Sequence, residues 1–330
     1  MFNIIHLPTV LAAALLAALS LPASAEPPGF GSRSVSSSAT ATRHESLRHA
    51  SRVVQPAPVY RRWMSPEIRE AWNAGFRGQE TRIVFVDDFL YGSSSWGNLN
   101  GTATRRRHGG LVRQQASMIA PSAEIRSVDF NTNERVVARP TGLTVVNLSY
   151  GIMGAPGYPI IESELAPQER SLLVHARRGT AVLVKAAGND AVAVGGRGPS
   201  GNVDYLALGL IGKPSTIFVG ALDRNGTRQN RSRLASYSNR AGANRAVQDR
   251  FLTVGVREDL TGLAGTSFAA PIVSGYAAIL GSKFKSASPT QISNQLLNTA
   301  RTDTIHNYRR SVHGRGEASI SRAIAPARIR

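Results

Sequence analysis

Four short apolar runs recur along the chain, separated by segments long enough to hold helices. They cover residues 83–86, 143–148, 181–186 and 217–222. Because the runs are apolar at successive positions rather than at alternate ones, both faces of each strand are expected to be buried. The pattern predicts an α/β fold in which a mostly parallel central sheet carries helices on both faces.

Two Ser-Pro pairs mark expected helix starts. Ser65-Pro66 and Ser288-Pro289 each precede apolar residues at helical spacing, and serine at the N-cap followed by proline in the first turn is typical of a helix N-terminus.

The N-terminus has the features of a targeting segment. Residues 11–21 form an apolar run rich in Leu and Ala, too short to span a bilayer, and Ala23-Ser24-Ala25 follows as a small-residue cleavage pattern. We expect a signal peptide over residues 1–25. Because the first ten residues contain no Lys or Arg, a buried or interfacial helix is the alternative. Export would place the protein in a bacterial periplasm, the cell envelope or the extracellular space, with no transmembrane helix in the mature chain.

The next segment differs in composition from the rest. Residues 26–64 are rich in Pro, Ser, Ala, Thr and Arg and contain a low-complexity stretch over 34–42. Such a segment lacks the periodic apolar residues that a core needs, so we expect a disordered leader or a short propeptide. Residues 65–330 are expected to form one folded domain.

The absence of cysteine excludes several kinds of reactive site, and the net charge suggests a class of partner. The chain has no cysteine, which excludes a thiol nucleophile, disulfides, a thiolate zinc site and an iron–sulfur cluster. It has 39 Lys and Arg against 21 Asp and Glu, a formal net charge of +18. A polyanion such as nucleic acid, acidic polysaccharide or anionic lipid is therefore one expected partner, and a solvated arginine face is the alternative.

Polar residues follow three of the apolar runs directly. Asp87 follows the first run, Ser149-Tyr150-Gly151 the second and, after Ala187, Gly188-Asn189 the third. In parallel sheets, reactive groups gather at the carboxyl ends of the strands. These residues are therefore candidates for one shared site.

A serine opens the most apolar helix that the sequence predicts. Gly265-Thr266-Ser267 leads through Pro271 into an apolar stretch over 272–280. A hydroxyl at a helix start lies near unpaired N–H groups and the positive dipole end, which favours a developing negative charge. The alternative is that Thr266 or Ser267 merely caps a core helix.

The stretch from Gly265 to Pro271 resembles the nucleophile motif of the subtilisin-like serine proteases, the subtilases. The segments 83–87, 108–112, 146–151 and 186–189 are similar to the family's aspartate, histidine, substrate-binding and oxyanion motifs, in the expected order. The resemblance implies a subtilisin-like fold and a serine endopeptidase that cleaves protein or peptide substrates through an acyl-enzyme.

The resemblance also implies a role for each matching residue. Asp87, His108 and Ser267 would form the catalytic triad, and the Asn189 side chain would donate to the oxyanion. Substrate backbone would pair with Ser149, Tyr150 and Gly151, opposite Ala187 and Gly188. For the triad and Asn189 the chemistry asks for the same groups, because attack on a peptide carbonyl needs a nucleophile, a base, a group that orients the base, and oxyanion donors.

The match departs from the family pattern at two places. Asp88 and Phe89 stand where the family usually has Thr or Ser followed by Gly, and Gly110 and Leu111 replace the usual residues after the histidine. Neither change removes a group that the chemistry needs. We expect Asp88 to line the substrate groove or to cap a turn.

His108 is the histidine placed to act as the base. It follows Asp87 at the distance of a loop and opens a segment with apolar Leu111 and Val112. None of the other six histidines has this placement. The alternative is an exposed loop histidine without a chemical role.

The remaining expectations concern ligands. Arginines gather at 105–107, just before His108, and again over residues 224–250. No cofactor is required for the chemistry. Many subtilases bind calcium, but no dense run of alternating Asp and Asn is present, so structural calcium stays open without assigned ligands. The alternative to the enzyme is a catalytically idle protein of the same fold that binds polyanions or peptides.

Overall fold

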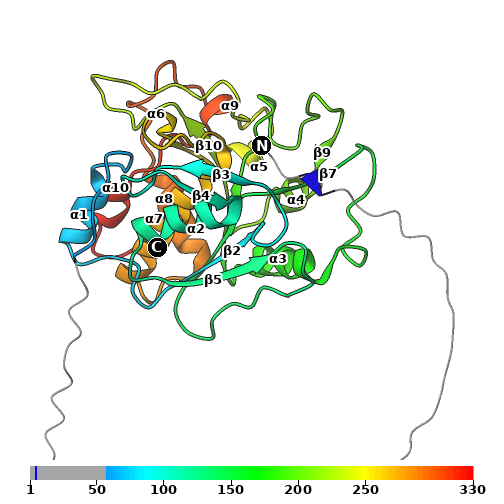
Figure 1. Ribbon diagram of the computed structural model, residues 1–330, viewed down its shortest axis with the longest axis horizontal. Coiled ribbons are helices and arrows are strands. Elements are labelled where there is room, and N and C mark those ends of the chain that lie inside the picture. The colour runs from blue at the N-terminus through cyan, green and yellow to red at the C-terminus, as the bar shows by residue number, and fades with distance from the viewer. Residues whose placement is uncertain (1–3, 6–56, 330) are drawn as a thin grey trace, which may run out of the picture. The chain divides into compact units, whose positions relative to one another are not determined.

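The computed structural model describes residues 4–5 and 57–329, and its centre is a six-stranded parallel sheet (Figure 1). The strands lie in the order β11-β10-β8-β6-β2-β5, and each pairs in parallel with its neighbours. Their bounds are β2 Arg82–Asp87, β5 Glu124–Asp129, β6 Thr144–Leu148, β8 Val182–Ala186, β10 Thr216–Leu222 and β11 Phe251–Gly255. This confirms the predicted fold class.

Two smaller sheets accompany the central one. A hairpin consists of β3 Ser94–Gly97 and β4 Thr104–Arg107. The other sheet consists of β1 Ile4–Ile5, β7 Gly151–Gly154 and β9 Val203–Asp204, with β7 in the middle. Both lie next to segments that were predicted to form the site.

Helices cover both faces of the central sheet. They are α1 Glu67–Asn73, α2 His108–Ile119, α3 Pro167–Arg178, α4 Tyr205–Leu210, α5 Arg245–Gln248, α6 Glu258–Thr261, α7 Ala270–Lys283, α8 Pro289–Asn298, α9 Arg310–His313 and α10 Ile320–Ile324, with a 3₁₀ turn η1 at Thr266–Phe268. Successive residues of a strand point to opposite faces. Accordingly, Ile83 and Phe85 of β2 pack with α2 and α7, whereas Val84 and Val86 pack with α3 and α4.

The four predicted apolar runs correspond to β2, β6, β8 and β10, and two further strands of the central sheet were missed. β5 lies at the sheet edge and is half-exposed at Arg126 and Ser127, so its sequence is more polar than that of a central strand. β11 is fully buried but short, and Thr253 interrupts its apolar sequence. Both strands were missed because the prediction looked for continuous runs of apolar residues.

The structure has a helix at each of the two predicted starts, and one of them begins one residue away from the predicted position. α8 begins at Pro289 with Ser288 as N-cap, and Ser288 and Gln291 form a reciprocal capping box, as expected. At the first pair the helix begins one residue later than predicted: Pro66, not Ser65, occupies the N-cap position. Ser65 Oγ still accepts a hydrogen bond from the N–H of Glu67, at 3.4 Å.

The packed part of the chain begins before the predicted boundary at residue 65. Trp63 and Met64 are 4% and 2% exposed and belong to the core, and the Trp63 indole N–H donates to the Leu99 carbonyl at 2.7 Å. An aromatic side chain with a hydrogen-bonded indole is anchored, not part of a leader. Apart from Ile4-Ile5, which form β1, the predicted signal peptide lies outside the described residues, as does most of the predicted leader. Within the described part of the chain, no helix is long and apolar enough to cross a membrane.

Candidate active site

Three of the predicted catalytic side chains line one cavity near the carboxyl ends of β2 and β8. The cavity has a volume of about 130 Å³, and His108, Asn189 and Ser267 are part of its wall. Asp87 is the last residue of β2 and lies behind His108, fully buried. Residues 180 positions apart in sequence thus meet where the parallel sheet brings its reactive ends together.

Asp87 and His108 form the closest polar pair of the site. Asp87 Oδ1 lies 2.6 Å from Nδ1 of His108, and the same oxygen accepts the N–H of Asp88 at 2.7 Å. The other carboxylate oxygen, Oδ2, is buried and has no hydrogen-bond partner among the described residues. His108 opens α2, so the helix start fixes the imidazole relative to β2.

This pairing sets the protonation of the imidazole. An ionised carboxylate only accepts hydrogen bonds, so Nδ1 of His108 carries the proton and Nε2 is left as the acceptor. Burial lowers the pKa of His108, but the charge of Asp87 and its hydrogen bond raise that pKa by more, and the net shift is upward. The Phe268 ring packs on the imidazole, with centroids 5.7 Å apart.

Ser267 lies in the 3₁₀ turn η1, directly before α7. Its hydroxyl donates to the Ser149 carbonyl at 3.2 Å, and the Ser149 hydroxyl donates to the Ser267 carbonyl at 2.9 Å. The Asn147 side-chain amide donates to the Ser149 hydroxyl, at 2.9 Å. These reciprocal bonds join the serine turn to the segment that follows β6.

The orientation of the Asn189 amide follows from its partners. Asn189 Oδ1 accepts from both the N–H and the hydroxyl of Thr266, at 2.8 and 2.9 Å. Because both partners are donors, the oxygen must face them, and Nδ2 is the donor left for the cavity. Gly265 has φ 117°, and a Cβ there would lie 3.0 Å from Asn189 Nδ2, so glycine permits this close approach.

The segment predicted to pair with substrate presents its backbone. The Tyr150 side chain is buried, and its hydroxyl donates to Glu169 at 3.3 Å, so that side chain faces away from the cavity. Gly151 and Ile152 pair in parallel with β1, which shows that this edge of β7 accepts an extended strand. Ser149 is 3% exposed and acts through the serine turn rather than through an open surface.

The opposite wall is held by a residue that the sequence reasoning missed. Asn239 donates from Nδ2 to the Ala187 carbonyl at 2.9 Å, and its Oδ1 accepts the N–H groups of Asp190 and Val192 at 3.0 Å each. Gly188 has φ 114°, and a Cβ there would lie 2.1 Å from Asn239 Nδ2. Nothing in the sequence around Asn239 signals this long-range role.

The turn after Asp87 accommodates the departures from the family pattern. Asp88 Oδ1 accepts the N–H groups of Tyr91 and Gly92, at 3.0 and 2.9 Å, so Asp88 caps the turn. Phe89 is not among the described residues with positive φ, so its backbone needs no glycine. A Cβ at Gly109 would lie 2.9 Å from the Phe89 ring, so the two residues are sterically matched.

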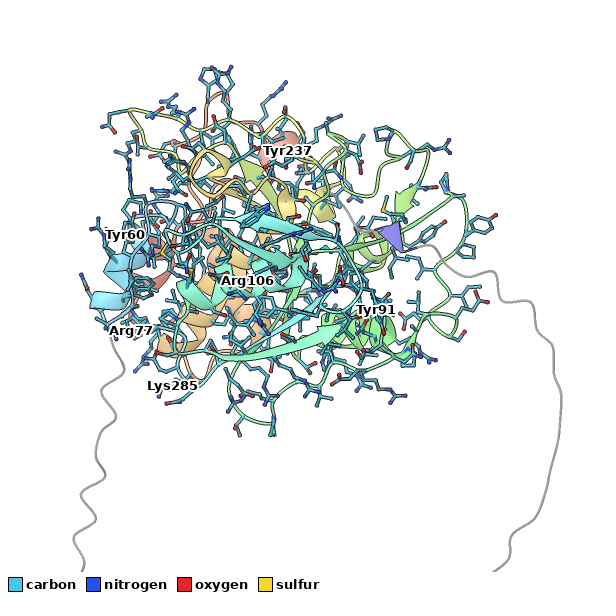
Figure 2. All side chains as sticks on the ribbon, in the orientation of Figure 1. Tyr60, Arg77, Tyr91, Arg106, Tyr237 and Lys285 are labelled. Carbon is cyan, nitrogen blue, oxygen red and sulfur yellow. The ribbon has the colours of Figure 1, made fainter. Side chains whose placement is uncertain are left out.

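The β3–β4 hairpin forms one side of the cavity. Trp96 lines the cavity although it is 64% exposed, and it stands opposite Arg105 in the hairpin. Arg105 and Arg106 are exposed, and Figure 2 shows the Arg106 side chain in front of the ribbon. Among the later arginines, Arg224 and Arg228 form ion pairs with Asp223 and Asp303. Arg105 and Arg106 therefore place two exposed cations on the hairpin whose Trp96 lines the cavity.

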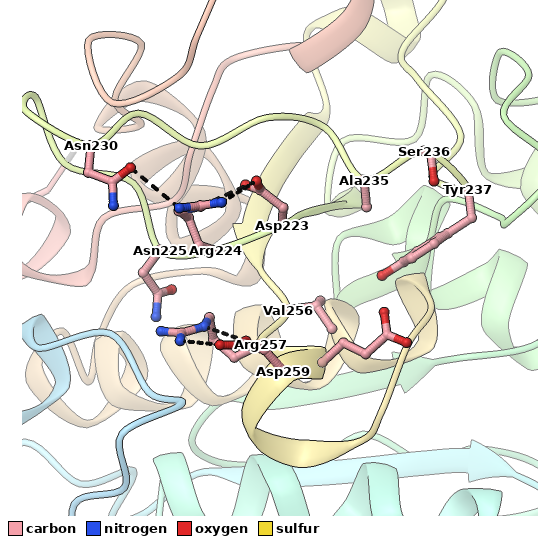
Figure 3. A pocket seen from close by; sticks show the side chains of 11 residues that line it. Asp223, Arg224, Asn225, Asn230, Ala235, Ser236, Tyr237, Val256, Arg257 and Asp259 are labelled. Atoms are coloured by element: carbon pink, nitrogen blue, oxygen red, sulfur yellow. Dashed lines mark hydrogen bonds and ion pairs between the residues drawn. The ribbon is translucent and has the colours of Figure 1, made fainter.

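A larger cavity, about 680 Å³, lies between the ends of β10 and β11 (Figure 3). Its charged side chains largely neutralise one another: Arg224 pairs with Asp223 at 3.1 Å and Arg257 with Asp259 at 2.5 Å. Its lining contains no histidine, so it lacks the base that hydroxyl activation requires. Volume alone therefore does not identify the reactive site.

Metal binding stays a prediction. In the part of the chain that the structure describes, no three His, Cys, Asp or Glu side chains form a group that could hold a metal ion. No residue is assigned to calcium.

Comparisons with known proteins identify the fold and the family. A search of curated proteins finds no match. One similar solved structure is a lanthipeptide protease, with 16% sequence identity, coverage of 79% of this chain and 92% of that chain, and a TM-score of 0.51. Another is the MycP3 protease of the type VII (ESX-3) secretion system, with 18% identity, coverage of 79% of this chain and 88% of that chain, and a TM-score of 0.51. Proteases from Pseudoalteromonas arctica are also similar, with 17% identity, coverage of 82% of this chain and 96% of that chain, and a TM-score of 0.50. At these identities the likeness shows the fold.

The model of the subtilase family matches residues 101–317. The match contains His108, Asn189 and Ser267, while Asp87 precedes it. Since it covers more than half of the chain, the chain belongs to the subtilase family.

Proposed function

We propose that the protein is an exported serine endopeptidase in which Asp87, His108 and Ser267 form the triad and Asn189 stabilises the oxyanion. The observation that carries the proposal is the 2.6 Å contact between Asp87 Oδ1 and His108 Nδ1, behind a cavity shared by His108, Asn189 and Ser267. Export rests on the N-terminal sequence pattern alone.

In the first half-reaction, Ser267 Oγ turns from the Ser149 carbonyl toward His108 and attacks the peptide carbonyl carbon. Its proton passes to His108 Nε2, and the carbonyl π electrons move to oxygen, where Asn189 Nδ2 and the N–H of Ser267 donate to the negative charge. When the intermediate collapses, the C–N bond breaks and His108 returns the proton to the leaving amine. Asp87 stabilises the imidazolium throughout.

In the second half-reaction, water replaces the amine. His108 removes a proton from the water, whose oxygen attacks the ester carbonyl, and the C–O bond to Ser267 breaks after a second tetrahedral intermediate. The carboxylic acid leaves and Ser267 regains its proton.

Substrate would bind as an extended chain. The pairing of β1 with Gly151 and Ile152 supports this proposal, because an added strand gains main-chain hydrogen bonds whatever its side chains are.

Asn189→Ala should lower kcat by roughly 100- to 1000-fold with little change in KM, because the amide acts chiefly on the transition-state oxyanion. Steady-state kinetics on a fluorogenic peptide measure this. Asn230→Ala, an exposed asparagine of the larger cavity, is the control and should leave both constants unchanged. A turnover that survives Asn189→Ala would exclude Asn189 from the site.

The acidic limb of the pH profile should reflect the raised pKa of His108. General-base catalysis needs the neutral imidazole, so kcat/KM should fall as the pH drops through that pKa, with a midpoint above about 6.5. Rates measured between about pH 5 and about pH 9, with circular dichroism to verify that the fold persists, test this. A midpoint below the ordinary histidine value would mean that burial outweighs the influence of Asp87.

The competing function is a catalytically idle protein that binds polyanions or peptides. The exposed arginines Arg231, Arg233, Arg240 and Arg245 are the feature that favours it. Incubation with unfolded casein, followed by mass spectrometry of the products, separates the two functions. Internal cleavage supports an endopeptidase, whereas retention on heparin without cleavage supports the binding protein.

A further inference from the structure

A third cavity, about 270 Å³, is lined by Gly188 and Asp190, the two chain neighbours of the proposed oxyanion donor Asn189. Its lining includes Met153, Ala187, Gly188, Asp190, Asp204 and Asn239. One water molecule occupies roughly 30 Å³ of liquid, so the space suits a long side chain.

The cavity is placed to receive one particular substrate residue. Gly188 and Asp190 flank Asn189 in the chain, and the N–H of Gly188 donates to Thr266 Oγ1 at 3.1 Å, next to Ser267. A carbonyl oxygen held by Asn189 belongs to a residue whose Cβ lies only two bonds from the carbonyl carbon. That side chain therefore lies beside Gly188 and Asp190.

Two carboxylates line the cavity, but only one is neutralised. Asp204 Oδ2 forms an ion pair with the buried Lys185 at 2.8 Å, and Oδ1 accepts the N–H groups of Ile152, Leu206 and Ala207 at 3.1–3.2 Å. Asp190 forms no ion pair with any described residue. Burial and the charge of Asp204 raise the pKa of Asp190, as expected for a carboxylate without a compensating cation.

The rest of the lining suits the stem of a basic side chain. Met153, Ala187 and Ala207 supply apolar surface, on which the methylenes of Lys or Arg can pack while the charged head reaches a carboxylate. The geometry points to Asp190 as a specificity-determining residue that selects Arg or Lys as the residue supplying the scissile carbonyl. This inference rests on the proposed function.

The test uses peptides that differ only at that residue, with Arg, Lys, Gln, Leu or Glu. The wild-type protein should cleave the Arg and Lys peptides with the highest kcat/KM. Asp190→Asn should reduce the preference for Arg over Gln by roughly 30-fold or more, because it leaves the substrate cation unpaired, and Asp190→Arg should favour Glu. Glu258→Gln removes an exposed carboxylate from the larger cavity and should leave the preference unchanged.

A wild-type preference for Leu, or a preference for Arg that survives Asp190→Asn, would overturn the role of Asp190 and leave the proposed function standing. If Glu258→Gln weakens the preference as much as Asp190→Asn, the effect is general electrostatics and the assignment is wrong. Failure of the folded wild-type protein to cleave any of the five peptides would overturn both proposals.

Discussion

Ser267→Ala should lower kcat for peptide hydrolysis by roughly 10⁶-fold, the size of effect expected when a nucleophile is removed from a triad that acts as a unit. The serine lies on the cavity shared with His108 and Asn189, in the 3₁₀ turn that precedes α7. Because the members act together, the double variant Ser267→Ala/His108→Ala should be barely slower than either single variant. Single-turnover and steady-state kinetics measure both comparisons.

Two other serines of α7 differ in whether they are connected to the serine turn. Ser274 donates to Asn147 Oδ1, and Asn147 in turn donates to the Ser149 hydroxyl, so Ser274→Ala would disturb the serine turn. Among the described residues, the Ser282 hydroxyl, on the same helix α7, bonds the local Ile279 carbonyl and the Gly78 N–H and no residue of the serine turn, so Ser282→Ala should retain full activity. Equal activity of Ser267→Ala and Ser282→Ala would refute the assignment of the nucleophile.

Asp87→Asn should lower kcat by roughly 10⁴-fold while the protein stays folded. The asparagine can turn its NH₂ group toward Nδ1 of His108, which moves the imidazole proton to Nε2 and removes the base. Asp88→Asn is the matched control, because an amide oxygen can still accept the N–H groups of Tyr91 and Gly92. Kinetics with a short ester and a peptide measure both variants, and nearly wild-type turnover of Asp87→Asn would mean that His108 needs no orienting carboxylate.

Much of the fold could be predicted because its strands are buried on both faces. Such strands are apolar at every position, which makes β6 and β8 conspicuous in the sequence. The helix α7 was conspicuous for the same reason: most of its residues are buried, and its small side chains let it pack closely on α2. The positions of Asp87 and Asn189 followed from where reactive groups gather on a parallel sheet.

What could not be predicted depends on contacts between distant residues. Trp63 packs in the core and its indole N–H donates to the distant Leu99 carbonyl, whereas composition placed it in the leader. Asn239 positions Ala187 and Gly188 from about fifty residues away, through bonds that no local motif encodes. The charge state of the cavity beside Asn189 likewise requires knowing that Lys185 meets Asp204 and not Asp190.

The central claim is that His108 and the oxyanion donors make one serine hydroxyl reactive. Ordinary serine hydroxyls are poor nucleophiles at neutral pH, so a fluorophosphonate reacts selectively only where a base and oxyanion donors converge. Labelling of the purified protein, followed by mass spectrometry of its peptides, should find the phosphonate on Ser267 alone, and His108→Ala should abolish it. A folded protein that takes up no label, or carries it on another serine, would contradict the account.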